Sequence, residues 1–428
     1  MEETLIEEGG DVNREIEVAP ALISVHPLEK SVAVAIGSQL RVYDLQGDCN
    51  VNLVDDSGGN LHSGSIRAIC YGSKGRLFSS AGDDKLVKIW STDSWHCTRT
   101  VCSEKRVSAV AISPDGLFVS YADKFGVVWV VALDGTSSEA NDKAAPLFAH
   151  YCSIITSLEF APDGRFIVSA DRDFKIRVTV FPNKPISGAH EIQSFCLGHT
   201  EFVSCMAFVS TPEYPQGFLL SGSGDSTVRL WDVTSGSLLD TCEVAAEAGL
   251  LESNEKEDMF SPAVTDICAS PDGSVVAVAI QRQVPQHFLL PLCVITNKVV
   301  SMGEIFIPTS LGLSSSPEHL WMITGASNLP ALDDPSFARV RVISGLLKES
   351  PDSGQDDPIL LEDSKIPGGE RLLEKLQGSV SIVKEEQTLA AAAEAVKTAM
   401  CNLLIKRQYS SEKRELRKRS RNDRKQKQ

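Results

Sequence analysis

The turn Ser113-Pro114-Asp115-Gly116 decides the fold, because near-copies of it follow at residues 161–164 and 270–273. Looser copies stand at residues 26–27, 73–75, 214–217 and 316–318, so that a turn recurs roughly every 48 residues. Alternating apolar runs flank the turns, which is typical of two strands joined by a tight turn. Repeats of this length bury their apolar faces against their neighbours. We therefore expect an all-β protein, a β-propeller of seven four-stranded blades.

The chain of 428 residues is longer than such a ring, so we assign the excess to its two ends and to insertions. Leu389, Ala393, Val396 and Met400 alternate at helical spacing, and this stripe packs either on the propeller or on a partner helix. Residues 12–20 are expected to supply the outer strand of the last blade and so close the ring. The predicted division is an N-terminal segment (1–19), the propeller (20–345), an acidic linker (346–380), a helix (381–407) and a basic disordered tail (408–428).

The net charge of −16 argues against a body that coats nucleic acid by itself. Eleven cysteines lie singly, without C-x-x-C pairs, and the first residues have no basic and apolar leader, which indicates a reduced compartment. No apolar run is long enough to span a membrane. We expect no metal, no cofactor, no catalytic residues and no small-molecule substrate, because no nucleotide-binding loop or paired metal ligands occur.

Two segments share four residue types at matched offsets from a tryptophan, and they resemble WD repeats. In such repeats an aspartate accepts from a histidine, the histidine contacts a serine hydroxyl, and the hydroxyl accepts from the indole N–H. We therefore interpret the histidine, serine and aspartate as structural tetrad members rather than as a catalytic triad. The fourth unit keeps His150, Ser169 and Asp173, with Thr179 in place of tryptophan. The two complete sets are His62, Ser80, Asp84 and Trp90, and His199, Ser221, Asp225 and Trp231.

The fourth unit contains more charge than a tetrad needs. It reads Ala170-Asp171-Arg172-Asp173-Phe174-Lys175-Ile176-Arg177-Val178, and the string Cys196-Leu197-Gly198-His199-Thr200-Glu201-Phe202-Val203-Ser204 follows. Such a charged cluster on a blade rim can form charge-assisted contacts with a partner protein. Together the two strings resemble the non-catalytic WD-repeat subunit of the tRNA (guanine-N7)-methyltransferase. Phe174 departs from the family pattern, in which that position is acidic.

The resemblance implies a propeller that performs no chemistry of its own. It implies a heterodimer with a separate S-adenosylmethionine-dependent methyltransferase, which the propeller holds in an active conformation. The product would be N7-methylguanosine in the variable loop of tRNA, at position 46, and tRNA would be bound through the complex. The rim of the third and fourth blades would carry the contact, and the residues implied for it are Asp171, Arg172, Lys175, Arg177, Thr200 and Glu201.

The basic tail differs sharply from the acidic body of the chain. Residues 406–428 contain eleven Lys and Arg against three Asp and Glu. Such a segment can serve as a nuclear import signal or as an arm that contacts tRNA phosphates. We expect a nuclear protein, with the signal formed by Lys413, Arg414, Arg417, Lys418, Arg419 and Arg421.

Two other functions remain open from the sequence. The chain could be a WD-repeat scaffold of another complex, such as a ubiquitin-ligase receptor or a ribosome-assembly factor. However, Trp231-Asp232-Val233-Thr234 lacks the Trp-Asp-x-Arg ending in which receptors of the cullin type resemble one another. A propeller enzyme would instead need acid–base residues at matched offsets in several blades, and the sequence predicts none.

Overall fold

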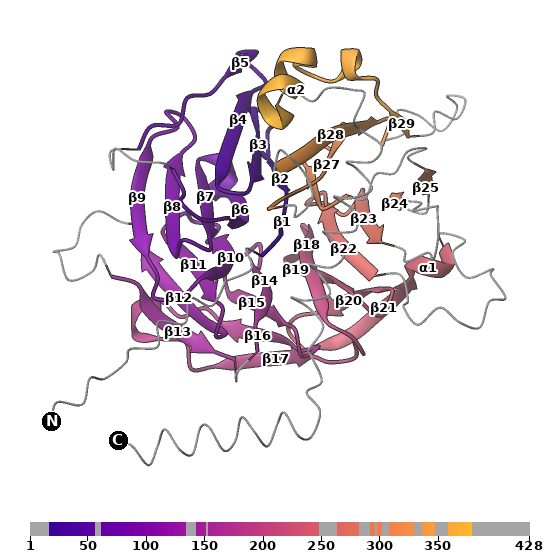
Figure 1. Ribbon diagram of the computed structural model, residues 1–428. Coiled ribbons are helices and arrows are strands. Elements are labelled where there is room, and N and C mark those ends of the chain that lie inside the picture. The colour runs from indigo at the N-terminus through magenta and orange to yellow at the C-terminus, as the bar shows by residue number, and fades with distance from the viewer. Residues whose placement is uncertain are drawn as a thin grey trace, which may run out of the picture.

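The computed structural model describes residues 17–55, 61–133, 143–150, 153–247, 263–281, 292–295, 298–301, 308–328, 336–346 and 358–378. Its strands form sheets arranged in a ring (Figure 1). Residues of the inner strands line a central channel. The expected all-β WD-repeat propeller is confirmed. The expected count of seven four-stranded blades is wrong: within the described residues, six sheets are four-stranded blades and a further sheet has five strands.

Each four-stranded blade uses four consecutive strands, hydrogen-bonded in chain order from the channel outward. Blade 1 has β2 (Leu22–Val25), β3 (Ser31–Ile36), β4 (Gln39–Asp44) and β5 (Cys49–Asn50). Blade 2 has β6 (Ile66–Gly72), β7 (Leu77–Gly82), β8 (Leu86–Ser91) and β9 (Cys97–Cys102). Blade 3 has β10 (Val107–Ile112), β11 (Phe118–Asp123), β12 (Val127–Ala132) and β13 (Ala145–Ala149).

The next three blades follow the same plan. Blade 4 has β14 (Ile155–Phe160), β15 (Phe166–Asp171), β16 (Ile176–Val180) and β17 (Ile192–Cys196). Blade 5 has β18 (Val203–Thr211), β19 (Tyr214–Ser223), β20 (Thr227–Asp232) and β21 (Ser237–Glu243), and it is followed by the short helix α1 (Val244–Glu247). Blade 6 has β22 (Ala263–Ala269), β23 (Val276–Gln281), β24 (Leu292–Ile295) and β25 (Lys298–Ser301).

The recurring turn joins the two inner strands of a blade. In blade 3 the Gly116 N–H donates to Ser113 O at 2.8 Å, and the Ser113 hydroxyl contacts the Asp115 carboxylate at 2.5 Å. The last residue of the turn has φ +75° at Gly116 and Gly164, and +71° at Gly273. Glycine adopts this left-handed conformation without steric cost, which explains why the motif ends in glycine.

The core lies between neighbouring blades. Blades 1 and 2, for example, enclose a cluster that includes Val42, Phe78 and Trp90. Side chains alternate between the two faces of a strand, so the period of two in the sequence places the apolar residues of each strand on its buried face. Each blade therefore depends on its neighbours for burial of its apolar surface.

The five-stranded sheet, here called blade 7, closes the ring with both ends of the described chain. Its strands are β1 (Ala19–Pro20), β26 (Ser310–Leu313), β27 (His319–Ser327), β28 (Ser336–Ser344) and β29 (Ile359–Leu360). Both β1 and β26 pair with β27, whereas β29 pairs with β28 and forms the outer edge. The expectation that residues 12–20 form the outer strand is therefore wrong for residues 17–20, and residues 12–16 lie outside the described residues. The N-terminal strand β1 instead lies on the same side of β27 as β26, at the inner edge of the sheet. It pairs with residues 326–327 of β27, beyond residues 320–323, with which β26 pairs.

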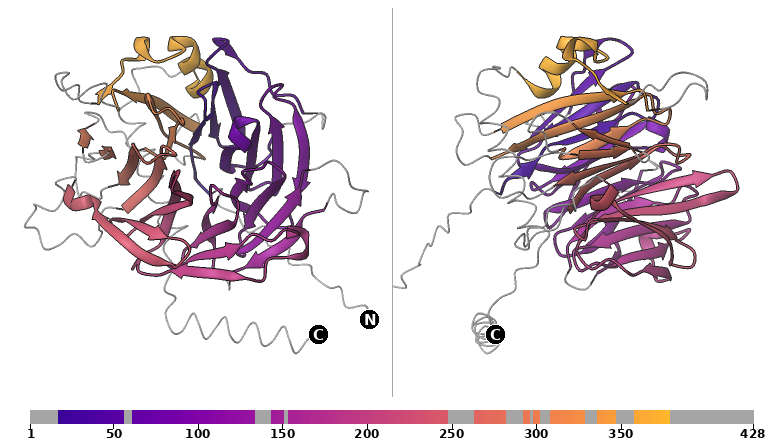
Figure 2. Two further views of the ribbon diagram at one scale, coloured as in Figure 1. Left: turned by 180° about the vertical axis from the view of Figure 1, so that it is seen from behind. Right: turned by 90° about the vertical axis from the view of Figure 1, so that its right-hand side faces the viewer.

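A nine-residue helix, α2 (Gly369–Gln377), covers the junction of blades 7 and 1 (Figures 1 and 2). Its Leu372, Leu373 and Leu376 are buried in a cluster with Tyr43 and Trp321. The 3-10 turn Asp363–Lys365 precedes it and ties back to blade 7, where Asp363 pairs with Arg339 and Arg341 at 3.0 and 2.6 Å. The expectation of a linker over 346–380 is therefore wrong for residues 358–378. The helix expected at 381–407 and the basic tail lie outside the described residues.

Candidate protein-binding surface

The turn between β15 and β16 places the charged residues of blade 4, and it divides them between the interior and the surface. Asp171, the last residue of β15, turns inward: its Oδ2 lies 2.9 Å from His150 Nδ1. Its Oδ1 accepts from the backbone N–H of Asp173 at 2.8 Å and of Lys175 at 3.2 Å. The prediction that Asp173 is the tetrad acid is thus wrong, and Asp171 is buried rather than available to a partner.

His150 completes a three-residue version of the tetrad. Its Nε2 lies 2.7 Å from Ser169 Oγ. Thr179 occupies the place of the tryptophan and is fully buried, and its hydroxyl has no hydrogen-bond partner among the residues described. The serine in blade 4 therefore lacks the indole donor that blades 2 and 5 provide.

Both complete tetrads have the geometry expected from the sequence. In blade 2, His62 Nδ1 lies 2.7 Å from Asp84 Oδ2, and Ser80 Oγ contacts His62 Nε2 at 2.9 Å and accepts from Trp90 Nε1 at 3.1 Å. In blade 5 the distances corresponding to these three contacts are 2.9, 2.8 and 2.8 Å, for His199 to Asp225, His199 to Ser221 and Trp231 to Ser221. The networks bind the loop that enters a blade to its third strand.

Arg172 and Lys175 extend from the blade 4 turn without a counter-charge. Lys175 is exposed and Arg172 is half-buried, and neither has an ion pair in the part of the chain that the structure describes. The Arg172 Nε is shielded from solvent and has no hydrogen-bond partner. A guanidinium without an ion pair can bind a carboxylate of a partner through its outer N–H groups.

Arg177 is oriented differently from these two residues. Its guanidinium lies 4.7 Å from the centre of the Phe148 ring and donates to Ala149 O at 3.2 Å. Burial lowers the pKa of its side chain. Arg177 and the fully buried Lys88 both lie opposite a tetrad serine in their blades. Lys88 pairs with Asp55, whereas Arg177 has no ion pair within the described residues.

Apolar side chains are exposed next to these cations. Phe174 in the turn is 41% exposed, and Phe195 and Leu197 are 45% and 62% exposed. Because Ile176 pairs with Cys196, Lys175 and Leu197 lie at the same end of neighbouring strands. We call Arg172, Phe174, Lys175, Phe195 and Leu197 the blade 4 patch. Apolar anchors beside unpaired cations are characteristic of protein interfaces.

The loop that leads into blade 5 belongs to the same face of the ring. The Thr200 backbone N–H donates to Asp225 Oδ2 at 3.0 Å, and Glu201 O accepts from the Ser223 hydroxyl at 3.2 Å. The side chains of both residues are exposed. Their backbones are therefore held by the tetrad of blade 5 while their side chains face solvent.

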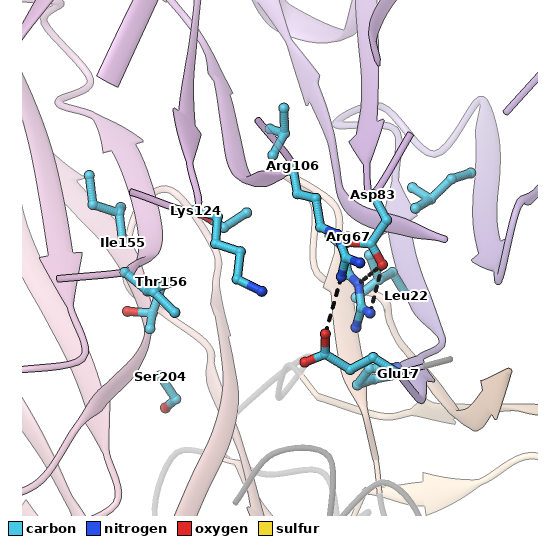
Figure 3. Close-up of a pocket in the computed structure, with 14 residues that line it drawn as sticks. Glu17, Leu22, Arg67, Asp83, Arg106, Lys124, Ile155, Thr156 and Ser204 are labelled. Carbon is cyan, nitrogen blue, oxygen red and sulfur yellow. Dashed lines mark hydrogen bonds and ion pairs between the residues drawn. The ribbon is translucent and has the colours of Figure 1, made fainter. Parts of the chain in front are cut away.

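The mouth of the channel on this face contains charges that the sequence did not predict (Figure 3). Asp83 pairs with Arg67 at 2.7 Å and lies 3.7 Å from Arg106. Glu17, just before β1, lies 3.3 Å from Arg106, and Lys124 extends toward the same pocket. These residues come from loops and strand starts of different blades. Offsets within a repeat therefore gave no signal for the cluster.

Two carboxyl groups line the channel itself, at different positions of their strands. They are Glu159 on β14 and Asp266 on β22. Burial, with a smaller contribution from the charge of Asp266, raises the pKa of Glu159 to about 8. Burial raises the pKa of Asp266 to about 6, although its oxygens accept from the backbone N–H of Leu311 and Ile267.

No helix among the described residues is long and apolar enough to cross a membrane. The six basic residues predicted as a nuclear signal lie outside the described residues.

Comparison with known proteins points to one family. Residues 143–301, from β13 through blade 6, match the family model described as tRNA methyltransferase TRM82 WD40 domain, and residues 60–91 match the WD domain, G-beta repeat. The resemblance predicted from blades 4 and 5 is therefore confirmed. The chain is also similar to a solved structure described as "Structure of U3-55K", with a TM-score of 0.54 and 17% identity over 72% of this chain and 90% of that one. That likeness concerns the fold alone.

Two curated relatives are both named as non-catalytic subunits of a tRNA (guanine-N(7)-)-methyltransferase. The chain is 31% identical over 270 residues to the tRNA (guanine-N(7)-)-methyltransferase non-catalytic subunit WDR4 of Mus musculus, covering 63% of this chain and 61% of that protein. It is 29% identical over 248 residues to the non-catalytic subunit wdr4 of Dictyostelium discoideum, covering 54% of this chain and 50% of that protein. The matches thus span only half to three fifths of the relatives' length.

Proposed function

We propose that this chain is the non-catalytic subunit of a tRNA (guanine-N7)-methyltransferase. In this proposal it forms a heterodimer with an S-adenosylmethionine-dependent catalytic subunit and stabilises that subunit for methylation of a guanine in the tRNA variable loop. The observation that carries the proposal is the blade 4 patch, where Arg172 and Lys175 lack counter-charges within the described residues and Phe174 is exposed. The names of the relatives support the identity of the partner.

The patch favours a partner that presents carboxylates around an apolar centre. Arg172 and Lys175 supply two cations, and Phe174, Phe195 and Leu197 supply apolar area. Desolvated charge pairs set the register of an interface, whereas buried aromatic anchors provide much of its affinity. Asp171 stabilises the turn through its hydrogen bond from the Asp173 backbone N–H. Arg177 packs on the ring of Phe148 in blade 3.

The experiment is co-expression of the full chain with the candidate catalytic subunit, followed by co-purification and a tRNA N7-methylguanosine assay. The test variant is Arg172→Glu/Lys175→Glu, which reverses charge at the surface and leaves Arg177 on Phe148. The matched control is Lys184→Glu/Lys365→Glu, a double reversal at two exposed lysines outside the patch. Loss of the complex and of activity in the test variant alone is expected.

Three results would contradict the proposal. One is a wild-type complex that forms without any N7-methylguanosine activity, which would favour a scaffold of another assembly. Another is a fully active Arg172→Glu/Lys175→Glu complex. The third is methyl transfer by the isolated chain, which would make it an enzyme in its own right.

We also propose that the protein acts in the nucleus and that residues 406–428 direct it there. Eleven basic side chains in this segment support the proposal. The same segment could contact tRNA phosphates beside the catalytic subunit.

A further inference from the structure

The turns at the bases of blades 1 and 7 meet where the ring closes. One joins β2 to β3 and contains Glu29, and the other joins β26 to β27 and contains Glu318 with His319 at its end. A backbone hydrogen bond from Ser315 N to Pro27 O, 2.8 Å long, ties the two turns together. The side chains on the two turns are therefore held close to each other across the first and last blades.

Three metal-ligating side chains converge at this junction. Glu29, Glu318 and His319 each offer one donor atom, and the three atoms lie within 4.8 Å of one another. Glu29 and His319 are only about a quarter exposed, at 24% and 23% of their side chains, while Glu318 is exposed. An imidazole and two carboxylates are a donor set that suits divalent transition metals, and water commonly completes such a site.

Glu29 gives a second, independent indication of a cation. Its Oε1 is shielded from solvent and accepts no hydrogen bond from the described residues. The nearest ion-pairing group is His319 Nδ1 at 3.8 Å, which is too far for a hydrogen bond. Two ligands of one tetrahedral zinc ion lie about 3.3 Å apart, since each metal–ligand bond is about 2.0–2.1 Å. A small approach of the two side chains would therefore let one ion satisfy both.

We propose that Glu29, Glu318 and His319 bind one divalent transition-metal ion, for which Zn²⁺ is the probe. Bound there, the ion joins blade 1 to blade 7 and stabilises the closed ring, because an ion that binds only the folded chain shifts the folding equilibrium toward it. This inference is independent of the proposed function and concerns a different part of the ring from the blade 4 patch.

The test uses the full chain, freed of metal with a chelator and kept in a thiol-free reductant. Calorimetric titration with Zn²⁺ and thermal melts with and without Zn²⁺ are compared for wild type, Glu318→Gln and His319→Ala. Glu318 is exposed, so its substitution tests the site without disturbing the core. His190→Ala removes an exposed histidine elsewhere and is the control.

Wild type and His190→Ala are expected to bind Zn²⁺ and to melt at a higher temperature in its presence. Glu318→Gln should bind at least about tenfold more weakly, since even changes to groups around metal ligands cost tenfold or more. His319→Ala should lose the thermal shift. The proposal is overturned if Zn²⁺ does not raise the wild-type melting temperature. It is also overturned if Zn²⁺ raises the melting temperature of both test variants as much as that of wild type, which would assign the ion to cysteines. A third contrary result is that His319→Ala lowers the melting temperature equally with and without Zn²⁺.

Discussion

The carboxylate of Asp171 lies 2.9 Å from the imidazole of His150, inside blade 4 rather than on its surface. This contact gives Asp171 the tetrad role that spacing assigned to Asp173. Asp171 also accepts two backbone N–H groups of the following turn, so it positions Arg172, Phe174 and Lys175 without facing a partner. The conformation of the blade 4 patch thus depends on a buried acid.

We expect Asp171→Asn to destabilise the protein by about 1–3 kcal/mol, because it disturbs a buried, charge-assisted hydrogen bond to His150. Asp173→Asn, two residues away, should cost clearly less. Urea unfolding of the two variants measures the difference. Equal losses of stability would mean that Asp173 shares the tetrad role.

The sequence predicted the tetrads well where the repeat is regular. Offsets from Trp90 and Trp231 identified the members of blades 2 and 5 correctly. They failed in blade 4, because its acid ends β15 itself, whereas Asp84 and Asp225 come two residues after their strands end. A count of residues cannot detect this difference in turn geometry.

Tertiary packing explains the other features that the sequence did not predict. Helix α2 follows an acidic segment rich in proline and glycine, and its Leu372, Leu373 and Leu376 pack in a cluster with apolar residues of blades 1 and 7. Glu159 and Asp266 occupy different positions of their strands, so no common offset pointed to the channel. Both cases depend on contacts between blades, which the repeat pattern does not encode.

The tetrad of blade 5 predicts sensitivity to acid. Burial alone would raise the pKa of Asp225, but hydrogen bonds from His199, Thr227 and the Thr200 backbone outweigh it and lower the pKa. A lowered pKa stabilises the fold above the usual value of 3.8, and that stability is lost as the pH falls through and below this value. Asp225→Asn should therefore melt at a lower temperature at pH 7 and lose less further stability below pH 4. Asp240→Asn, at an exposed site, should keep the wild-type profile; a wild-type profile in Asp225→Asn as well would refute this assignment.

Glu159 predicts the opposite pH dependence. Its pKa of about 8 exceeds the ordinary 4.5, so the folded protein retains a proton that the unfolded chain releases. Stability should fall as the pH rises through this window. Glu159→Gln should then be more stable than wild type at pH 8.5, by about 1–3 kcal/mol, and nearly equal to it at pH 4.5. Melting curves across this range test the expectation, with Glu213→Gln as an exposed control. Parallel curves for Glu159→Gln and wild type would contradict it.

The tail should control where the protein accumulates. Removal of residues 406–428 takes away eleven basic side chains and should reduce nuclear accumulation. Fluorescence imaging of tagged full-length and truncated protein measures the effect. Fusion of the same segment to an unrelated cytosolic protein is the positive control. An unchanged distribution of the truncated protein would assign nuclear entry to the partner or to another segment.

Helix α2 should contribute to the stability of the ring although it lies outside the repeats. Leu372 is fully buried between Tyr43 of blade 1 and residues of blade 7, so Leu372→Ala should cost about 2–5 kcal/mol. Arg371→Ala removes a neighbouring side chain that is 80% exposed and should be nearly neutral. Truncation after residue 346 should lower the melting temperature more than truncation after residue 378, because only the first removes the packed leucines. If both truncated chains melted like the full chain, α2 would not stabilise the junction of blades 7 and 1.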